Sequence, residues 1–91
     1  MNIQITSGVE TRVGEDGIWR LTLDGFHIAL NTVGGRIWEG LQKGQSVNEI
    51  GSSMVRDFSV PRARVDDDIA QFLVCLRDNF LISLAPSETA T

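Results

Sequence analysis

The sequence is poor in the side chains on which many enzymes and metal sites depend. Its 91 residues include one histidine, His27, and one cysteine, Cys75, so an intramolecular disulfide is impossible. A lone free thiol is typical of reducing compartments. No apolar run is long enough to cross a bilayer, and no basic-then-apolar signal segment stands at the start. Together these absences predict a small soluble cytoplasmic protein without a membrane partner.

No motif in the sequence indicates catalysis, a cofactor or a metal ion. A dyad of His27 and Cys75 would require the two side chains to converge, and the strand expected around His27 directs that side chain away from its apolar face. The three consecutive carboxylates of residues 66–68 diverge on a helix and cannot easily chelate one ion. Gly34 and Gly35 lie inside an expected helix and lack the spacing of a phosphate-binding loop. We therefore expect a protein that is not an enzyme and that holds no cofactor and no metal.

The charge pattern disfavours nucleic acid as a partner. The net charge is −4, and Arg62, Arg64 and Arg77 of the last expected helix are outnumbered by the aspartates of the same segment. A DNA-recognition helix needs Arg, Lys, Asn or Gln side chains that reach base edges and phosphates. A winged-helix nucleic-acid-binding protein therefore stays open only as a less favoured alternative.

The first third of the chain predicts a three-stranded antiparallel meander over about residues 8–14, 18–23 and 26–30. Asp24-Gly25 is a strong hairpin signal, because both residues of a type I′ turn need positive φ. Folding there sets apolar residues opposite one another: Leu23 with Phe26, Leu21 with Ile28 and Trp19 with Leu30. A three-residue loop over 15–17, ending in a left-handed glycine, gives the first strand a matching register. In this order the strand 26–30 is an edge.

The last two thirds predict three helices. Asn31 is a favoured N-cap for the first helix, and Ser46 with Glu49 fits a capping box at the start of the second. Pro61 begins a third helix that runs to about Asn79, with apolar residues at helical spacing. The predicted fold class is therefore α+β, with an N-terminal three-stranded antiparallel sheet followed by three α-helices, the make-up of a winged helix-turn-helix.

The length and composition predict one domain over residues 1–84. Single domains usually span about 50 to 250 residues, and no internal repeat divides this chain. The end of the sequence, residues 85–91, is small, polar and proline-containing. We expect it to be a flexible C-terminal tail.

The strand 26–30, Phe-His-Ile-Ala-Leu, lacks the features that usually protect a sheet edge. Natural edge strands carry lysine, proline or an inward charge, or they are covered, and this strand has no lysine, proline or carboxylate. An extended peptide could pair with such an edge and place alternate side chains beside the last helix. The apolar residues of the strand and helix are by default core, and the sequence does not separate the two roles.

A spaced pattern of residues runs through about residues 18–82. It begins with Leu30-Asn31, Gly34, Ile37-Trp38 and Leu41, continues with Gly44, Ser46-Val47 and Glu49-Ile50, and closes with Asp68-Ile69, Phe72-Leu73, Leu76 and Leu81-Ile82. This pattern resembles the PqqD-like family, the precursor-recognition elements of ribosomally synthesised and post-translationally modified peptides (RiPPs). That family commonly has glycine before the final Leu-Ile, where this chain has Phe80. We therefore expect the third helix to close differently, with Asn79 in the left-handed conformation.

The resemblance implies a winged helix-turn-helix protein that binds, without catalysis, the leader region of a RiPP precursor as an added antiparallel strand. The peptide would lie in the cleft between the third strand and the third helix, against Phe26, His27, Ile28, Ala29, Leu30, Val65, Asp68, Ile69, Phe72, Leu73 and Leu76. The implied partners are this precursor peptide and a separate processing enzyme such as a leader protease. We favour the lasso-peptide type. The alternative is the peptide chaperone of pyrroloquinoline quinone biosynthesis, which presents its precursor to a radical-SAM enzyme.

Overall fold

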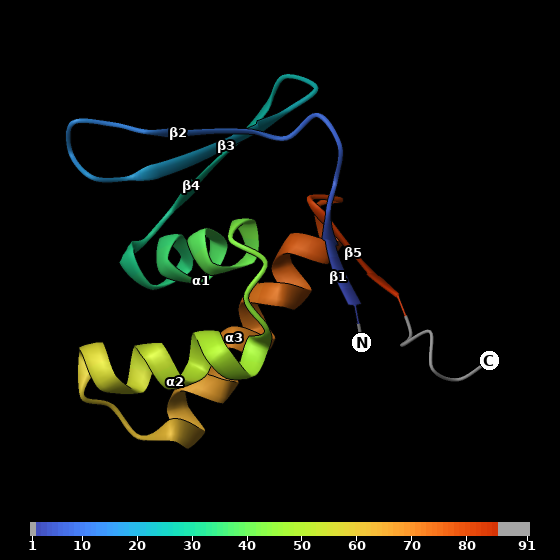
Figure 1. Ribbon diagram of the computed structural model, residues 1–91. Helices are drawn as coiled ribbons and strands as arrows, with labels where there is room; N and C mark the ends of the chain where they lie inside the picture. The colour runs from blue at the N-terminus through green and yellow to red at the C-terminus, as the bar shows by residue number, and fades with distance from the viewer. Residues whose placement is uncertain (1, 86–91) are drawn as a thin grey trace.

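The computed structural model describes residues 2–85, in which two small antiparallel sheets flank three helices (Figure 1). The strands are β1 (Asn2–Ile5), β2 (Glu10–Val13), β3 (Trp19–Leu23), β4 (Phe26–Leu30) and β5 (Ile82–Ala85), and the helices are α1 (Thr32–Gln42), α2 (Val47–Phe58) and α3 (Arg62–Asp78). One sheet has the order β2-β3-β4, and the other pairs β1 with β5. The α+β class, with a small antiparallel sheet and three helices, is confirmed.

Both turns of the meander have the expected form. Asp24 and Gly25 have φ values of 51° and 82°, as a type I′ turn requires, and β3 pairs with β4 in the expected register. The loop between β2 and β3 is closed by the Gly14 N–H, which donates to the Ile18 carbonyl at 3.0 Å. Gly17 in that loop has a φ of 80°, so the predicted left-handed glycine is confirmed. The apolar residues of the strands consequently share one face of the sheet.

The sequence interpretation missed β1 and β5. These strands pair antiparallel, with Ile5 opposite Ile82, and lie side by side in Figure 1. Leu81 and Ile82 are buried in the core, at 1% and 3% exposure. Because most of the chain separates the two strands, no local turn signal marks their pairing. The expected tail begins at residue 85, whereas β5 includes Ala85, and residues 86–91 lie outside the described residues.

Two hydrophobic clusters hold the sheet and the helices together. The first joins the meander to α1 and to the end of α3 through Leu21, Leu30, Trp38, Leu76, Leu81 and Ile82. The second lies among the three helices and contains Ile37, Ile50, Met54, Val65 and Ile69. Trp38 is fully buried, and its indole N–H donates to Thr11 Oγ1 of β2 at 3.1 Å. Helix α1 therefore packs on the sheet with one side and on α2 and α3 with the other.

Three glycines allow the neighbours of α1 to approach its backbone closely. A Cβ added at Gly34, Gly35 or Gly40 would lie 2.9 Å from Phe72 Cε1, 2.7 Å from Trp19 Cδ1 or 2.6 Å from Ile50 Cγ1, respectively. These separations are well below a carbon–carbon contact distance of about 3.5 Å. The close packing of α1 therefore accounts for glycines that weaken a helix by roughly 1 kcal/mol each.

The expected starts of α1 and α2 are confirmed. The Asn31 side chain accepts a hydrogen bond from the Gly34 N–H at 2.7 Å. At the start of α2, Ser46 Oγ accepts from the Glu49 N–H at 3.0 Å and Glu49 Oε1 accepts from the Ser46 N–H at 2.8 Å. This reciprocal pair satisfies two backbone donors that a helix end leaves free.

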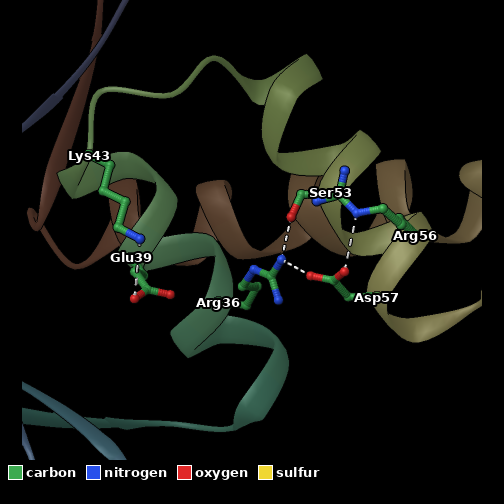
Figure 2. A network of polar contacts seen from close by, with 6 residues as sticks. All are labelled: Arg36, Glu39, Lys43, Ser53, Arg56 and Asp57. Carbon is green, nitrogen blue, oxygen red and sulfur yellow. Dashed lines mark hydrogen bonds and ion pairs between the residues drawn. The ribbon is translucent and has the colours of Figure 1, made fainter.

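A polar network ties α2 to α1 (Figure 2). Arg36 of α1 donates to Ser53 Oγ and forms an ion pair with Asp57, both on α2. The Arg36 guanidinium also lies 5.7 Å from the ring centroid of Phe58, close enough for a cation–π contact. The hydrogen bond from Arg36, assisted by one from Arg56, holds the pKa of the Asp57 carboxyl below its usual value. The ionised Asp57 carboxylate therefore helps to hold α2 in its orientation against α1.

Candidate functional site

The outer edge of β4 carries a short run of free backbone groups. Since the Gly14 N–H bonds to the Ile18 carbonyl, the even-numbered residues of β3 bond toward β2 and the odd-numbered ones toward β4. Their partners on β4 are residues 26, 28 and 30. The N–H and C=O groups of His27 and Ala29 therefore point away from the sheet, where a further strand would lie.

Two hollows lie beside this edge. The first, which we call the turn hollow, has a volume of about 450 Å³ and is lined by Leu23, Asp24, Phe26, Asp78, Asn79 and Phe80. The second, which we call the cap hollow, has a volume of about 420 Å³ and is lined by Asn31, Val33, Gly34, Arg64, Asp68, Gln71 and Phe72. Each combines residues at one end of β4 with residues of α3 or its C-terminal end. We refer to the two hollows together as the groove.

The candidate residues of β4 divide between the two faces of the sheet. Phe26 is 54% exposed, Ile28 is half-buried and Leu30 is buried, and all three side chains lie on the face that is turned toward the helices. The side chains of His27 and Ala29 lie on the opposite face, where His27 Nδ1 is 3.1 Å from Thr22 Oγ1. His27 and Ala29 can therefore meet a guest strand through their backbone groups.

The candidate residues of α3 also divide. Three of them are core residues with 1% exposure, namely Val65, Ile69 and Leu76. They support the helix from behind and present no surface to a peptide. Asp68 and Phe72 are half-buried and line the cap hollow, and both Phe72 and Leu73 pack against the two hydrophobic clusters. Among the candidates, Asp68 and Phe72 therefore line the cap hollow and Phe26 lines the turn hollow, whereas Ile28 packs against the core.

Several residues at the groove were not among the sequence candidates. On α3 these are Arg64, Gln71 and Asp78, which line the hollows together with the candidates Asp68 and Phe72. Cys75 is exposed, and its position on the same stripe places it between the two hollows. Gln71 and Cys75 lie three residues after Asp68 and Phe72, respectively, and Arg64 lies four residues before Asp68, so helical spacing from these two candidates would have found them. The apolar pattern instead drew attention to the core face of the helix.

The end of α3 differs from the expectation that Asn79 is left-handed. Asn79 has a φ of −99°, and Phe80 is the left-handed residue, with a φ of 63°. The Phe80 N–H donates to the Arg77 carbonyl at 3.0 Å and the Leu81 N–H donates to the Leu76 carbonyl at 2.9 Å. This is a Schellman motif, in which the left-handed position follows the cap residue. Phe80 therefore occupies the position at which glycine is usual.

Three further features of the described chain bear on the site. Among residues 2–85, no three His, Cys, Asp or Glu side chains lie so that they could hold a metal ion. None of the helices over these residues has the length and apolar character needed to cross a membrane. A larger hollow, of about 780 Å³, lies against the strands of the meander and is lined by His27, Ile28 and Ala29 of β4 together with Glu10, Thr11, Arg12, Arg20 and Thr22.

Comparison with known proteins identifies the family. Residues 17–82 match the family described as coenzyme PQQ synthesis protein D (PqqD). The chain belongs to the PqqD family. The resemblance read from the spaced residues is thereby confirmed. No curated protein matches the chain.

Two solved structures share the fold of this PqqD-family chain over nearly its whole length. A structure of TbiB1 in complex with the TbiA(beta) leader peptide matches with a TM-score of 0.83 and 28% identity, covering 92% of this chain and 99% of that chain. A lasso peptide synthetase B1 complexed with the leader peptide matches with a TM-score of 0.82 and 21% identity, covering 92% of this chain and all of the other, at 100%. Both similar proteins were solved with a leader peptide.

Proposed function

We propose that this PqqD-family protein binds the leader region of a RiPP precursor peptide, without catalysis, as a strand added to β4. The observation that carries the proposal is the free edge at His27 and Ala29, which lies beside α3 with a hollow at each end. The likeness to TbiB1, solved with a leader peptide, supports it further. The bound precursor would then be delivered to a separate processing enzyme.

Strand addition suits the chemistry of this groove. A guest strand would exchange hydrogen bonds with the outward N–H and C=O groups of His27 and Ala29. Every second guest side chain would point toward α3, because strand side chains alternate between the two faces. Phe26 and Ile28 offer apolar contact on that side, and Asp68 adds a carboxylate in the cap hollow. Backbone pairing would provide affinity and the groove would provide selectivity.

We assign the fold to the winged helix-turn-helix class, with residues 1–84 acting as one domain. Support comes from the packing of α2 on α3 across a short connection and from the β3–β4 hairpin that precedes the helices in the chain. A nucleic-acid role is less favoured. Arg62, at the start of α3, already donates to Asp66 at 2.8 Å, Asn48 at 2.9 Å and Ser52 at 3.2 Å. Its donors are therefore engaged within the protein rather than free for phosphates.

We place the protein in a lasso-peptide pathway, with a leader protease as the enzyme served. Support comes from the likeness to a lasso peptide synthetase B1. Precursor presentation to a radical-SAM enzyme in pyrroloquinoline quinone biosynthesis is the alternative. Either role would be carried out in the cytoplasm, where a ribosomal precursor first becomes available.

An amide chemical-shift titration tests the binding mode. The probe is a synthetic peptide with the leader sequence of the precursor encoded beside this gene. We expect the largest shifts at residues 26–30 and along the groove side of α3. A folded protein that shows no shift at His27 and Ala29 would contradict strand addition. A parallel titration with duplex DNA separates the winged-helix alternative, because binding through phosphates would weaken steeply as salt is added.

A further inference from the structure

Phe80 stands in an unfavourable position that no packing role explains. Its φ of 63° lies in the left-handed region, which is costly for residues with a Cβ, and its side chain is 77% exposed. The core residue of this turn is the next one, Leu81, at 1% exposure. Glycine at position 80 would close the helix with less strain. The exposed ring therefore contributes little to folding, and within the part of the chain that the structure describes it lines the turn hollow.

Two other residues of the turn hollow are also placed against local preference. Asp78 lies in the last turn of α3, where the helix dipole disfavours a carboxylate, and its ion-pair partner is the exposed Arg77 at 3.4 Å. Phe26 exposes 54% of its surface on an edge strand. Asp24, in the β3–β4 turn, takes part in none of the ion pairs formed within residues 2–85. Exposed rings and weakly partnered carboxylates thus meet at one end of the groove.

We propose that the turn hollow binds a lysine or arginine side chain of the leader peptide. This inference rests on the proposed function and names one feature of the sequence that the groove selects. The aliphatic stem would lie along the rings of Phe26 and Phe80, and the cationic head would reach the carboxylates of Asp24 and Asp78. Long basic side chains combine an apolar stem with a charged tip, and a cation is attracted to the face of an aromatic ring.

The charges of the hollow decide between this occupant and others. A purely apolar side chain would cover Asp24 and Asp78 without supplying a partner, and removing a carboxylate from water without one costs free energy. An acidic side chain would meet two like charges. A basic side chain satisfies both the rings and the carboxylates, and the net charge of −4 also attracts a basic segment during encounter. In a guest strand this residue would lie at the end nearest the β3–β4 turn.

The test uses a synthetic peptide with the leader sequence of the precursor encoded beside this gene. Replacing its lysine or arginine at the turn end by norleucine keeps an apolar stem and removes the charge. We expect the dissociation constant to rise about two- to five-fold, the range of an exposed cation–π contact. Phe80→Gly should weaken binding by a similar factor without lowering the melting temperature. Asp24→Asn and Asp78→Asn should each weaken binding and flatten its salt dependence.

Glu15→Gln provides the matched control. It removes one exposed carboxylate from the β2–β3 loop, outside both groove hollows, so any effect on affinity reports net charge alone. Peptide shifts at His27 and Ala29, combined with affinity that is unchanged by Phe80→Gly and by both Asp→Asn changes, would overturn this inference and leave the proposed function standing. Equal or tighter binding of the norleucine peptide would also overturn it, in favour of an apolar occupant. Absence of shifts on β4 would refute the proposed function itself.

Discussion

Replacing Ala29 by proline removes an outward backbone donor from β4 while leaving the sheet's own hydrogen bonds in place. Ala29 belongs to the residues whose N–H points away from β3. Proline is tolerated on edge strands when its missing N–H faces solvent. The preceding residue, Ile28, is already in the extended conformation that proline requires. Ala29→Pro should therefore fold and should lack one of the donors that a guest strand uses.

The expected loss of affinity follows from one hydrogen bond. A net backbone hydrogen bond contributes about 0.5–1.5 kcal/mol, which corresponds to roughly two- to thirteen-fold in the dissociation constant. The pyrrolidine ring also occupies the space through which the guest carbonyl approaches, so we expect the upper part of that range, about ten-fold. The free energy of unfolding should change by less than about 1 kcal/mol, because no internal bond is lost. Ala29→Pro is thus expected to weaken leader binding while leaving the stability of the fold nearly unchanged.

Isothermal titration calorimetry with the leader peptide measures the dissociation constant of Ala29→Pro. Urea unfolding of the same variant measures its free energy of unfolding. Val13→Pro is the matched control, since Val13 lies on the opposite edge of the meander, is 49% exposed and has an N–H that also points outward. It should leave leader affinity unchanged. Equal affinity of Ala29→Pro and the unchanged protein, or equal losses from both proline variants, would refute the assignment of the guest strand to β4. Ile28→Pro differs from both because it removes a donor used by β3, and it should destabilise the hairpin.

Three further predictions concern the groove, the helix packing and the polar network. Leader peptide should slow the alkylation of Cys75 by iodoacetamide, because the position of this thiol on α3 lies between the two hollows. The rate is measured by mass spectrometry, and an unchanged rate with saturating peptide would mean that the peptide binds elsewhere. Gly35→Ala should lower the free energy of unfolding by about 1–3 kcal/mol in urea, since its Cβ would lie 2.7 Å from Trp19 Cδ1; unchanged stability would mean that the indole moves freely. The pKa of Asp57 is lowered in the folded protein by its hydrogen bond to Arg36, so its contribution to stability is present above about pH 4 and is lost as the pH falls through the lowered pKa. Asp57→Asn should flatten the acid limb of a stability curve recorded from pH 6 to pH 2, and an identical limb would show that the ion pair does not stabilise the fold.

The elements that could be predicted from the sequence depend on interactions within a few residues. The Asp24-Gly25 turn is specified by the two positive φ values that it requires, and the register of β3 and β4 follows from it. The caps at Asn31 and Ser46 satisfy helix donors three residues away. Such turns and caps can be recognised in the sequence because both interacting residues lie in the same short stretch. The free edge of β4 is a direct consequence of these local features.

The parts that were missed depend on contacts between distant segments. The left-handed residue at the end of α3 follows from the return of Leu81 to the core, where its carbonyl accepts from the Thr6 N–H at 2.9 Å. Thr6 Oγ1 also donates to the Phe80 carbonyl at 2.6 Å. No pattern around position 80 indicates these contacts with the other end of the chain. The choice between Asn79 and Phe80 could therefore not be made from the helix sequence alone.

The division of α3 into core and groove residues was hidden for a related reason. An apolar stripe at helical spacing marks the side of a helix that is buried, and Val65, Ile69 and Leu76 follow that rule. Residues that line a groove lie at the margin of the stripe, where Asp68 and Gln71 are as informative as Phe72. Their role becomes visible only when β4 is placed beside them.

The groove is also where this protein departs from local preference. The core residues obey their local rules, and the buried glycines of α1 and α2 lie where a neighbouring side chain approaches the helix closely. The departures are an unprotected edge at β4, a left-handed phenylalanine at position 80 and a carboxylate in the last turn of α3. None of them adds packing to the core, and each could be removed without loss of a buried contact. Because departures of this kind are retained mainly at functional sites, their convergence on one groove favours selection for binding over selection for stability.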